Sequence, residues 1–154
     1  MQGIITRQSR DDSGQPRVTV LSEDDVMFRF EKLSVWQKVI ELADAVHRVT
    51  QAFPADERFE LASQLRRAAV SISSNIAEGS SRSSNADFAR FVEISYGSLL
   101  EIVSQLHIAK RQQLISSDAF NDHYAQADEV CRMLSGLRSS LVKEEQSSGR
   151  SDFV

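Results

Sequence analysis

A row of polar side chains with helical spacing is the part of this sequence best suited to chemistry. It consists of Gln64, Arg67, Ser71, Asn75 and Glu78, which recur every three or four residues and therefore lie on one side of a helix. An amide, a guanidinium, a hydroxyl and a carboxylate in one row can form hydrogen bonds and ion pairs with a neighbouring helix. The alternative interpretation is a solvated face, which needs no partner.

A second polar row follows on the next predicted helix and offers partners for the first. It contains Glu93, Ser98, Glu101 and Gln105. Arg66 and Arg67 are adjacent, so they point about 100° apart and cannot both serve one exposed face. Because Arg–Glu pairs at an interface can fix the register of packing, we expect the first row, with Ser98 and Glu101, to lie at a helix–helix or subunit interface.

Other constellations that carry chemistry are incomplete. A di-iron bundle requires two Glu-x-x-His pairs, and the nearest approach is the single Asp44-x-x-His47, so we expect no metal and no cofactor. Cys131 falls on an apolar row, which favours a small buried side chain over a nucleophile. His107 and His123 lack ligand spacing, which favours structural roles. Without a Gly-x-Ser-x-Gly elbow or a glycine-rich loop, the sequence predicts no catalytic residues.

Basic side chains are spread along the chain. The net charge is −4, which argues against a uniformly positive surface that coats nucleic acid. Phosphate contacts require clustered charges, because counterion release scales with the number of charges engaged. The candidates for nucleic-acid contact are Arg66, Arg82, Lys110 and Arg111. Their gathering on one exposed surface would favour nucleic-acid binding.

Four amphipathic helices would position these residues. Apolar residues at steps of three and four predict helices over about 34–52, 60–79, 85–113 and 118–142, and the apolar stripe of the third includes Ile94. Two prolines in 154 residues and an apolar content of 41% favour helices around one core. Short connections then predict an all-α fold, an antiparallel up-down-up-down four-helix bundle over residues 29–142.

Individual residues predict where these helices begin and end. Ser34 is the expected N-cap of the first helix, and Gly79 is expected to stop the second in a left-handed conformation. Ser84 and Asp87 resemble a capping box that opens the third. Gly97, in the middle of the third helix, costs about 1 kcal/mol relative to alanine. It therefore indicates a close helix crossing or the approach of a partner's backbone.

The two ends of the chain lie outside the predicted bundle. Residues 1–28 are polar and turn-rich, so we expect a flexible, mostly disordered extension in which Val18–Leu21 is a β-prone run able to dock or pair. Residues 143–154 are expected to form a flexible tail. No apolar run approaches the roughly 20 residues that span a bilayer, and the N-terminus lacks a secretory signal. We therefore expect a cytoplasmic protein without a membrane partner.

Six short motifs resemble those of a known bacterial family. They are Leu33-x-x-Trp36-Gln37, Phe53-Pro54-x-x-Glu57-Arg58, Gln64-x-Arg66-Arg67-Ala68, Ser71-Ile72-x-x-Asn75-Ile76-Ala77-Glu78-Gly79, Phe88-x-Arg90-Phe91 and Gly97-Ser98-Leu99-x-Glu101. In this order and spacing they resemble the four-helix-bundle family of 23S rRNA intervening-sequence proteins. That family also includes the accessory variability determinant of diversity-generating retroelements. The resemblance covers about residues 30–141.

The resemblance implies a four-helix bundle that assembles as a homopentamer, a barrel-like ring with a central channel. The family name implies that some members are encoded within insertions of ribosomal RNA genes. The retroelement members bind nucleic acid and a reverse transcriptase through a strongly basic surface. This chain departs from them, because its core is slightly acidic.

Three functions are compatible with the residues and the resemblance. The first is a non-enzymatic oligomeric scaffold that binds further copies of itself and engages RNA or an RNA-handling protein. The alternative is a ring or chaperone that binds RNA or DNA directly. The third is an enzyme or small-ligand binder at a subunit interface, which would use Arg67 with Glu78 or Glu101.

Overall fold

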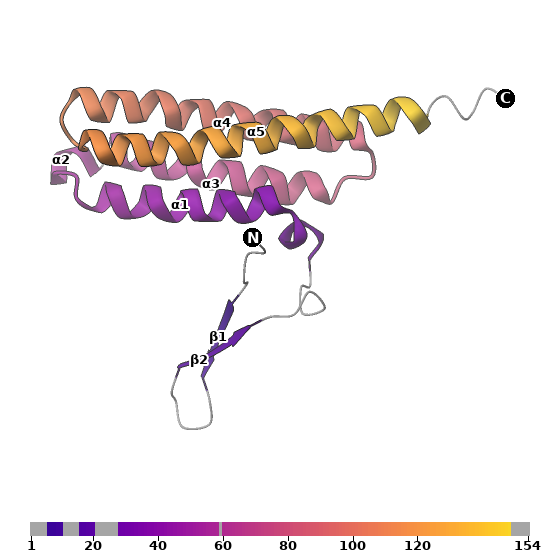
Figure 1. Ribbon diagram of the computed structural model, residues 1–154, viewed down its shortest axis with the longest axis horizontal. Coiled ribbons are helices and arrows are strands. Elements are labelled where there is room, and N and C mark those ends of the chain that lie inside the picture. Colours follow the sequence, from indigo (N-terminus) through magenta and orange to yellow (C-terminus); the bar gives the residue numbers. More distant parts are fainter. Residues whose placement is uncertain (1–5, 11–15, 21–27, 59, 149–154) are drawn as a thin grey trace.

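Four long helices make up most of the chain in the computed structural model, which describes residues 6–10, 16–20, 28–58 and 60–148. They are α1 (Ser34–Gln51), α3 (Leu61–Ser80), α4 (Asn85–Arg111) and α5 (Ser117–Ser148). Two short elements accompany them, η2 (Arg29–Lys32) and α2 (Ala55–Arg58). Helix α3 packs against α1 and α4, and α5 packs against α4 and α1, so the four helices surround a shared core (Figure 1). The prediction of an all-helical body with four helices is confirmed.

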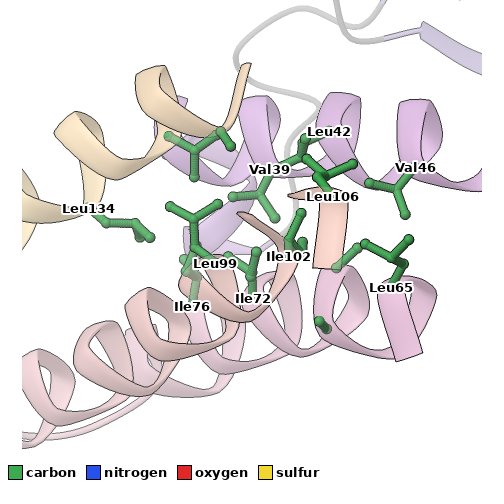
Figure 2. Close-up of a cluster of buried hydrophobic side chains, with 14 of the residues drawn as sticks. Val39, Leu42, Val46, Leu65, Ile72, Ile76, Leu99, Ile102, Leu106 and Leu134 are labelled. Carbon is green, nitrogen blue, oxygen red and sulfur yellow. The ribbon is translucent and has the colours of Figure 1, made fainter. Parts of the chain in front are cut away.

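The apolar stripes of all four helices meet in this core. The side chains labelled in Figure 2 come from α1, α3, α4 and α5, and Ile72, Ile76 and Leu99 are completely buried among them. Burying one such side chain stabilises the fold by roughly 1.5–3 kcal/mol. No helix in the described ranges has the length and apolar composition needed to cross a bilayer.

Of two predicted N-caps, the one of α4 is confirmed and the one of α1 is not. Ser84 is the N-cap of α4, and its Oγ accepts a hydrogen bond from the Asp87 backbone N–H at 3.1 Å. The prediction for Ser34 was wrong. Leu33 is the N-cap of α1 and makes no side-chain cap bond, so Ser34 is already the first helical residue. A hydrophobic residue can hold this position because packing of the α1 stripe drives the helix.

Gly79 has a different role from the predicted one. Helix α3 continues through it to Ser80 and ends at Ser81 in a right-handed conformation. A Cβ at Gly79 would lie 2.6 Å from the Phe91 Cβ and 2.7 Å from the Phe88 Cδ2, both on α4. The glycine is therefore required by the close approach of α3 to α4. At Gly97 a Cβ would meet nothing within 4 Å, so the expected close helix crossing there is absent from the described chain, and the approach of a partner's backbone stays a prediction.

The Ser84 cap gives a local test of this description. Ser84→Ala should lower the free energy of unfolding by about 1 kcal/mol, because the Asp87 N–H loses its acceptor. Ser83→Ala, at the exposed neighbouring residue, is the matched control and should change stability by less than about 0.5 kcal/mol. Urea unfolding at equal protein concentration measures both. Equal losses for the two variants would contradict the cap.

The two ends of the chain contain more regular structure than expected. Strands β1 (Thr6–Arg10) and β2 (Pro16–Val20) pair antiparallel, with Thr6 opposite Val20, so most of the β-prone run finds a partner where disorder was expected. The remainder of the 1–27 arm and residues 149–154 lie outside the described residues. Helix α5 extends to Ser148, past the predicted end at 142. Its last turns are rich in lysine, glutamate and glutamine, which are good helix formers even without burial.

Candidate functional site

Polar side chains of α3 and α4 form a hydrogen-bonded set that we call the α3–α4 network. Its members are Gln64, Ser71, Asn75, Ser98, Glu101 and Gln105. The Ser71 and Ser98 hydroxyl oxygens lie 2.9 Å apart, and the Asn75 Nδ2 donates to the Ser71 carbonyl at 2.8 Å. Two turns away the Gln105 Nε2 donates to the Gln64 Oε1 at 3.3 Å and to the Glu101 Oε1 at 3.1 Å. Parts of the two predicted polar rows therefore meet within one chain, whereas Glu93 of the second row accepts from Arg138 on α5 at 2.7 Å.

Two members of the predicted set are not in this network. Glu78 forms an ion pair with Arg82 at 2.7 Å on the surface. Arg67 is exposed and has no hydrogen bond or ion pair within the described ranges. Arg67 lies about 60° further from the core than Gln64 around α3, and the Glu101 carboxylate, one of the partners that the second row offered, accepts from Gln105 instead.

Exposed isoleucines flank the network along α4. Residues 94, 98, 101, 105 and 108 follow one another at steps of four, three, four and three, the spacing of a coiled-coil seam. We call this row the α4 seam. Ile94 was expected in the core stripe but is 52% exposed, and Ile108 is 44% exposed. The α4 seam thus has the pattern of a helix-packing surface, while no described helix covers its two isoleucines.

One buried acceptor in the α4 seam lacks a partner. Gln105 is 6% exposed, and its Oε1 makes no hydrogen bond to any described residue. A buried polar atom left unpaired costs about 1–3 kcal/mol. A donor from outside the chain would remove that cost.

The four candidates for nucleic-acid contact do not gather on one surface. Arg82 follows Arg66 by sixteen residues, which corresponds to roughly 24 Å along a helix. Its guanidinium forms an ion pair with Glu78 and lies 4.6 Å from the centre of the Phe91 ring. The Lys110 Nζ lies 4.4 Å from the centre of the Phe120 ring. Arg111 is exposed at the end of α4. The clustering that would favour direct nucleic-acid binding by these four residues is therefore not formed within one chain.

Arg66 makes a contact that sequence reasoning missed. Its Nε donates to the Oγ1 of Thr50 on α1 at 2.8 Å, and the Thr50 hydroxyl donates in turn to the Val46 carbonyl at 2.8 Å. Thr50 is completely buried. The sequence did contain a signal for this contact, because Thr50 is a polar residue on the apolar side of α1 and therefore needs a partner. Arg66 and Arg67 also line one open depression of about 460 Å³ with Ser63, Val70 and Ser71. The expectation that these adjacent arginines cannot both serve one exposed face was therefore wrong.

The remaining candidates have ordinary structural surroundings. Asp44 pairs with Arg48, and the His47 Nε2 lies 3.2 Å from the Gln51 Nε2. His123 connects α5 with α1. Its ring nitrogens face the carbonyl oxygens of Ala119 on α5 at 2.7 Å and of Ala45 on α1 at 3.2 Å. His107 packs edge-on against Phe120. Over the ranges that the structure describes, no three His, Cys, Asp or Glu side chains are grouped so that they could hold a metal ion.

Among the residues that the structure describes, two side chains have a shifted pKa, and in each case one neighbour is the main cause. A hydrogen bond with half-buried Cys131 raises the pKa of Tyr96, and Coulombic interaction with Cys131 and burial act in the same direction. A hydrogen bond with Glu41 raises the pKa of Lys38, aided by the charges of Glu41 and Glu129. Both shifts stabilise the protonated forms. Neither group joins the α3–α4 network.

Comparisons with known proteins relate this architecture to one family. The model of the family described as 23S rRNA-intervening sequence protein matches residues 31–136. A solved structure of a protein of unknown function from Bacteroides thetaiotaomicron VPI-5482, from the S23 ribosomal protein family, has a similar fold with a TM-score of 0.64 and 22% sequence identity. That match covers 68% of this chain and 97% of the other. Comparison with curated proteins finds no match.

Proposed function

This chain belongs to the 23S rRNA-intervening sequence protein family, and from that premise we propose that it is a non-enzymatic scaffold that assembles with further copies of itself. In this proposal the four helices alternate in direction, and the copies form the ring of five that the family resemblance implies. The assembled ring works in the cytoplasm and engages RNA or an RNA-handling protein.

The exposed α4 seam is the observation that carries this proposal. Ile94 and Ile108 are half exposed with the spacing of helix packing. Between them on α4 lies the small side chain of Ser98, in contact with Ser71 of α3, and small side chains would allow the backbone of another helix to approach closely. A helix from a second copy laid along the α4 seam would bury both isoleucines and could supply a donor to the Gln105 Oε1.

The surface ion pairs are compatible with a scaffold. Most of them join residues three or four apart on one helix, as in Glu78–Arg82, Asp87–Arg90 and Asp128–Arg132. Such pairs are typical of a solvated helix surface and contribute only about 0.2–0.5 kcal/mol each. Lys38 belongs to these surface pairs through Glu41, and Tyr96 is hydrogen-bonded to Cys131.

Assembly through the α4 seam can be tested with matched charge insertions on one helix. Ile94→Glu should reduce the mass of the assembled protein toward that of one protomer, because a carboxylate would be buried at the contact. Leu100→Glu is the control, since Leu100 is 50% exposed on the same helix but lies about 100° round from Glu101. Size-exclusion chromatography with light scattering measures the masses, and circular dichroism checks the fold.

The masses of the wild type and of the two variants decide whether the protein assembles through the α4 seam. We expect a wild-type mass of several protomers, retained by Leu100→Glu and lost by Ile94→Glu. A monomeric wild-type protein would overturn the proposal. Equal behaviour of the two variants would show that assembly does not use the α4 seam.

A further inference from the structure

We propose that the open depression on α3 is an oxyanion site that binds a phosphate group. Ser63, Arg66, Arg67, Val70 and Ser71 line this depression, which has a volume of about 460 Å³ and which we call the Arg66–Arg67 site. Two guanidinium groups and two hydroxyls supply hydrogen-bond donors. No carboxylate is among the lining residues, so nothing in the lining neutralises the two positive charges.

Arg66 is held in an orientation suited to this role. Its Nε donates to the buried Thr50 Oγ1 at 2.8 Å, and Thr50 is anchored because its hydroxyl lies 2.8 Å from the Val46 carbonyl oxygen. With Nε occupied, the two terminal nitrogens of the guanidinium have no partner within the described part of the chain. A guanidinium fixed at its inner nitrogen presents a fork of donors, the geometry that recognises two oxygens of a phosphate.

The Arg66–Arg67 site brings together two adjacent arginines that have no carboxylate partner on any described side chain. Five other arginines have carboxylate partners, whereas Arg29 and Arg111 have none among the described side chains: the pairs are Arg48 with Asp44, Arg82 with Glu78, Arg90 with Asp87, Arg132 with Asp128 and Arg138 with Glu93. For Arg66 and Arg67, no carboxylate oxygen lies within 4.0 Å among the side chains that the structure describes, which do not include that of Glu57. Two adjacent cations without a counterion repel each other, and a bound anion would offset that repulsion.

The number of donors favours phosphate over a carboxylate. A carboxylate has two oxygens, which one guanidinium already satisfies. Phosphate presents more oxygens, which could use the second guanidinium and the hydroxyl of Ser63. The phosphate could come from the backbone of RNA or from a free phosphate. The inference does not rest on assembly through the α4 seam, because Arg66 and Arg67 carry the charge of the site and neither takes part in the α3–α4 network, although Ser71 belongs to both.

The test uses the full chain, inorganic phosphate and a labelled single-stranded RNA. Arg66→Gln and Arg67→Gln each remove one charge of the site, and Arg111→Gln removes a charge from an exposed arginine outside it. In the first arm, the melting temperature is followed against inorganic phosphate, with chloride at equal ionic strength as reference. In the second, RNA binding is followed by fluorescence anisotropy at about 50 and 200 mM salt.

We expect phosphate to raise the melting temperature of the wild type and of Arg111→Gln, and to leave Arg66→Gln and Arg67→Gln unchanged. If the source is RNA, each site variant should also weaken RNA binding about tenfold and lower the salt slope by about one. A phosphate response without RNA binding identifies a free phosphate as the ligand. Absence of a phosphate-specific response in the wild type, or an equal loss in Arg111→Gln, would overturn the site.

Thr50 provides a second test that leaves both charges in place. Thr50→Val removes the acceptor of the Arg66 Nε, so the phosphate response should weaken although the net charge is unchanged. Thr50→Ser keeps a hydroxyl and should restore the response. A wild-type response in Thr50→Val would contradict a positioning role for Thr50. Light scattering on all variants separates this site from assembly, because these substitutions should leave the mass unchanged whereas Ile94→Glu should lower it.

Discussion

Replacing Ile72 with alanine should lower the free energy of unfolding by about 2–5 kcal/mol. Ile72 is completely buried on α3, among side chains from the other long helices (Figure 2). Because those helices close around the site, the structure can collapse only partly into the space that the lost atoms leave. Urea unfolding measures the change, at one protomer concentration for all variants, since association makes apparent stability depend on concentration.

Ile40→Ala is the matched control for that experiment. The same atoms are removed, but Ile40 is 41% exposed on α1, so less apolar surface returns to water and no cavity forms. We expect a loss below about 1 kcal/mol. A loss at Ile72 no larger than the loss at Ile40 would contradict the central position of Ile72.

Replacing Gly79 with alanine should destabilise the fold by about 1–3 kcal/mol. The new Cβ would lie 2.6 Å from the Phe91 Cβ, which moves only with the backbone of α4, and 2.7 Å from a ring carbon of Phe88. Helix α3 would therefore have to separate from α4. This cost exceeds the helix-propensity gain of about 1 kcal/mol that alanine brings over glycine.

The other helical glycines should respond with the opposite sign. A Cβ at Gly97 or Gly136 meets nothing within 4 Å, so alanine should stabilise the fold by up to about 1 kcal/mol at each. Thermal unfolding of the three variants compares them directly, and the same sign at Gly79 and Gly97 would contradict the close approach of α3 to α4. If Gly97→Ala stabilises the protomer but lowers the assembled mass, a partner's backbone approaches there, as the sequence suggested.

Some local features were visible in the sequence because they depend on few neighbouring residues. The apolar spacing of Leu65, Ile72 and Ile76 predicts the buried stripe of α3, and all three are completely buried. The Ser84 cap involves a backbone N–H only three residues away. The polar rows on successive helices contain Ser71 and Ser98, whose hydroxyl oxygens lie 2.9 Å apart, but which members of the two rows meet was not predicted.

The role of Gly79 and the exposure of Ile94 could not be predicted from local sequence patterns. A glycine that stops a helix and a glycine that admits a neighbouring helix are identical in sequence, and the Phe88 and Phe91 contacts come from α4. Ile94 continues an apolar pattern, yet it is half exposed. The pattern specifies the direction of a buried stripe, but the packing of adjacent helices decides how wide that stripe is.

The sequence by itself determined four amphipathic helices, a shared core and the family, because periodicity and motifs are properties of the chain order. Only the tertiary structure decided which polar groups meet. The Glu101 carboxylate, one of the groups that could have paired with Arg67, accepts a hydrogen bond from Gln105 because of the way α3 is rotated against α4. The Arg66–Thr50 contact joins residues sixteen positions apart on different helices. Such pairings depend on how whole helices are rotated and placed, which no local pattern records.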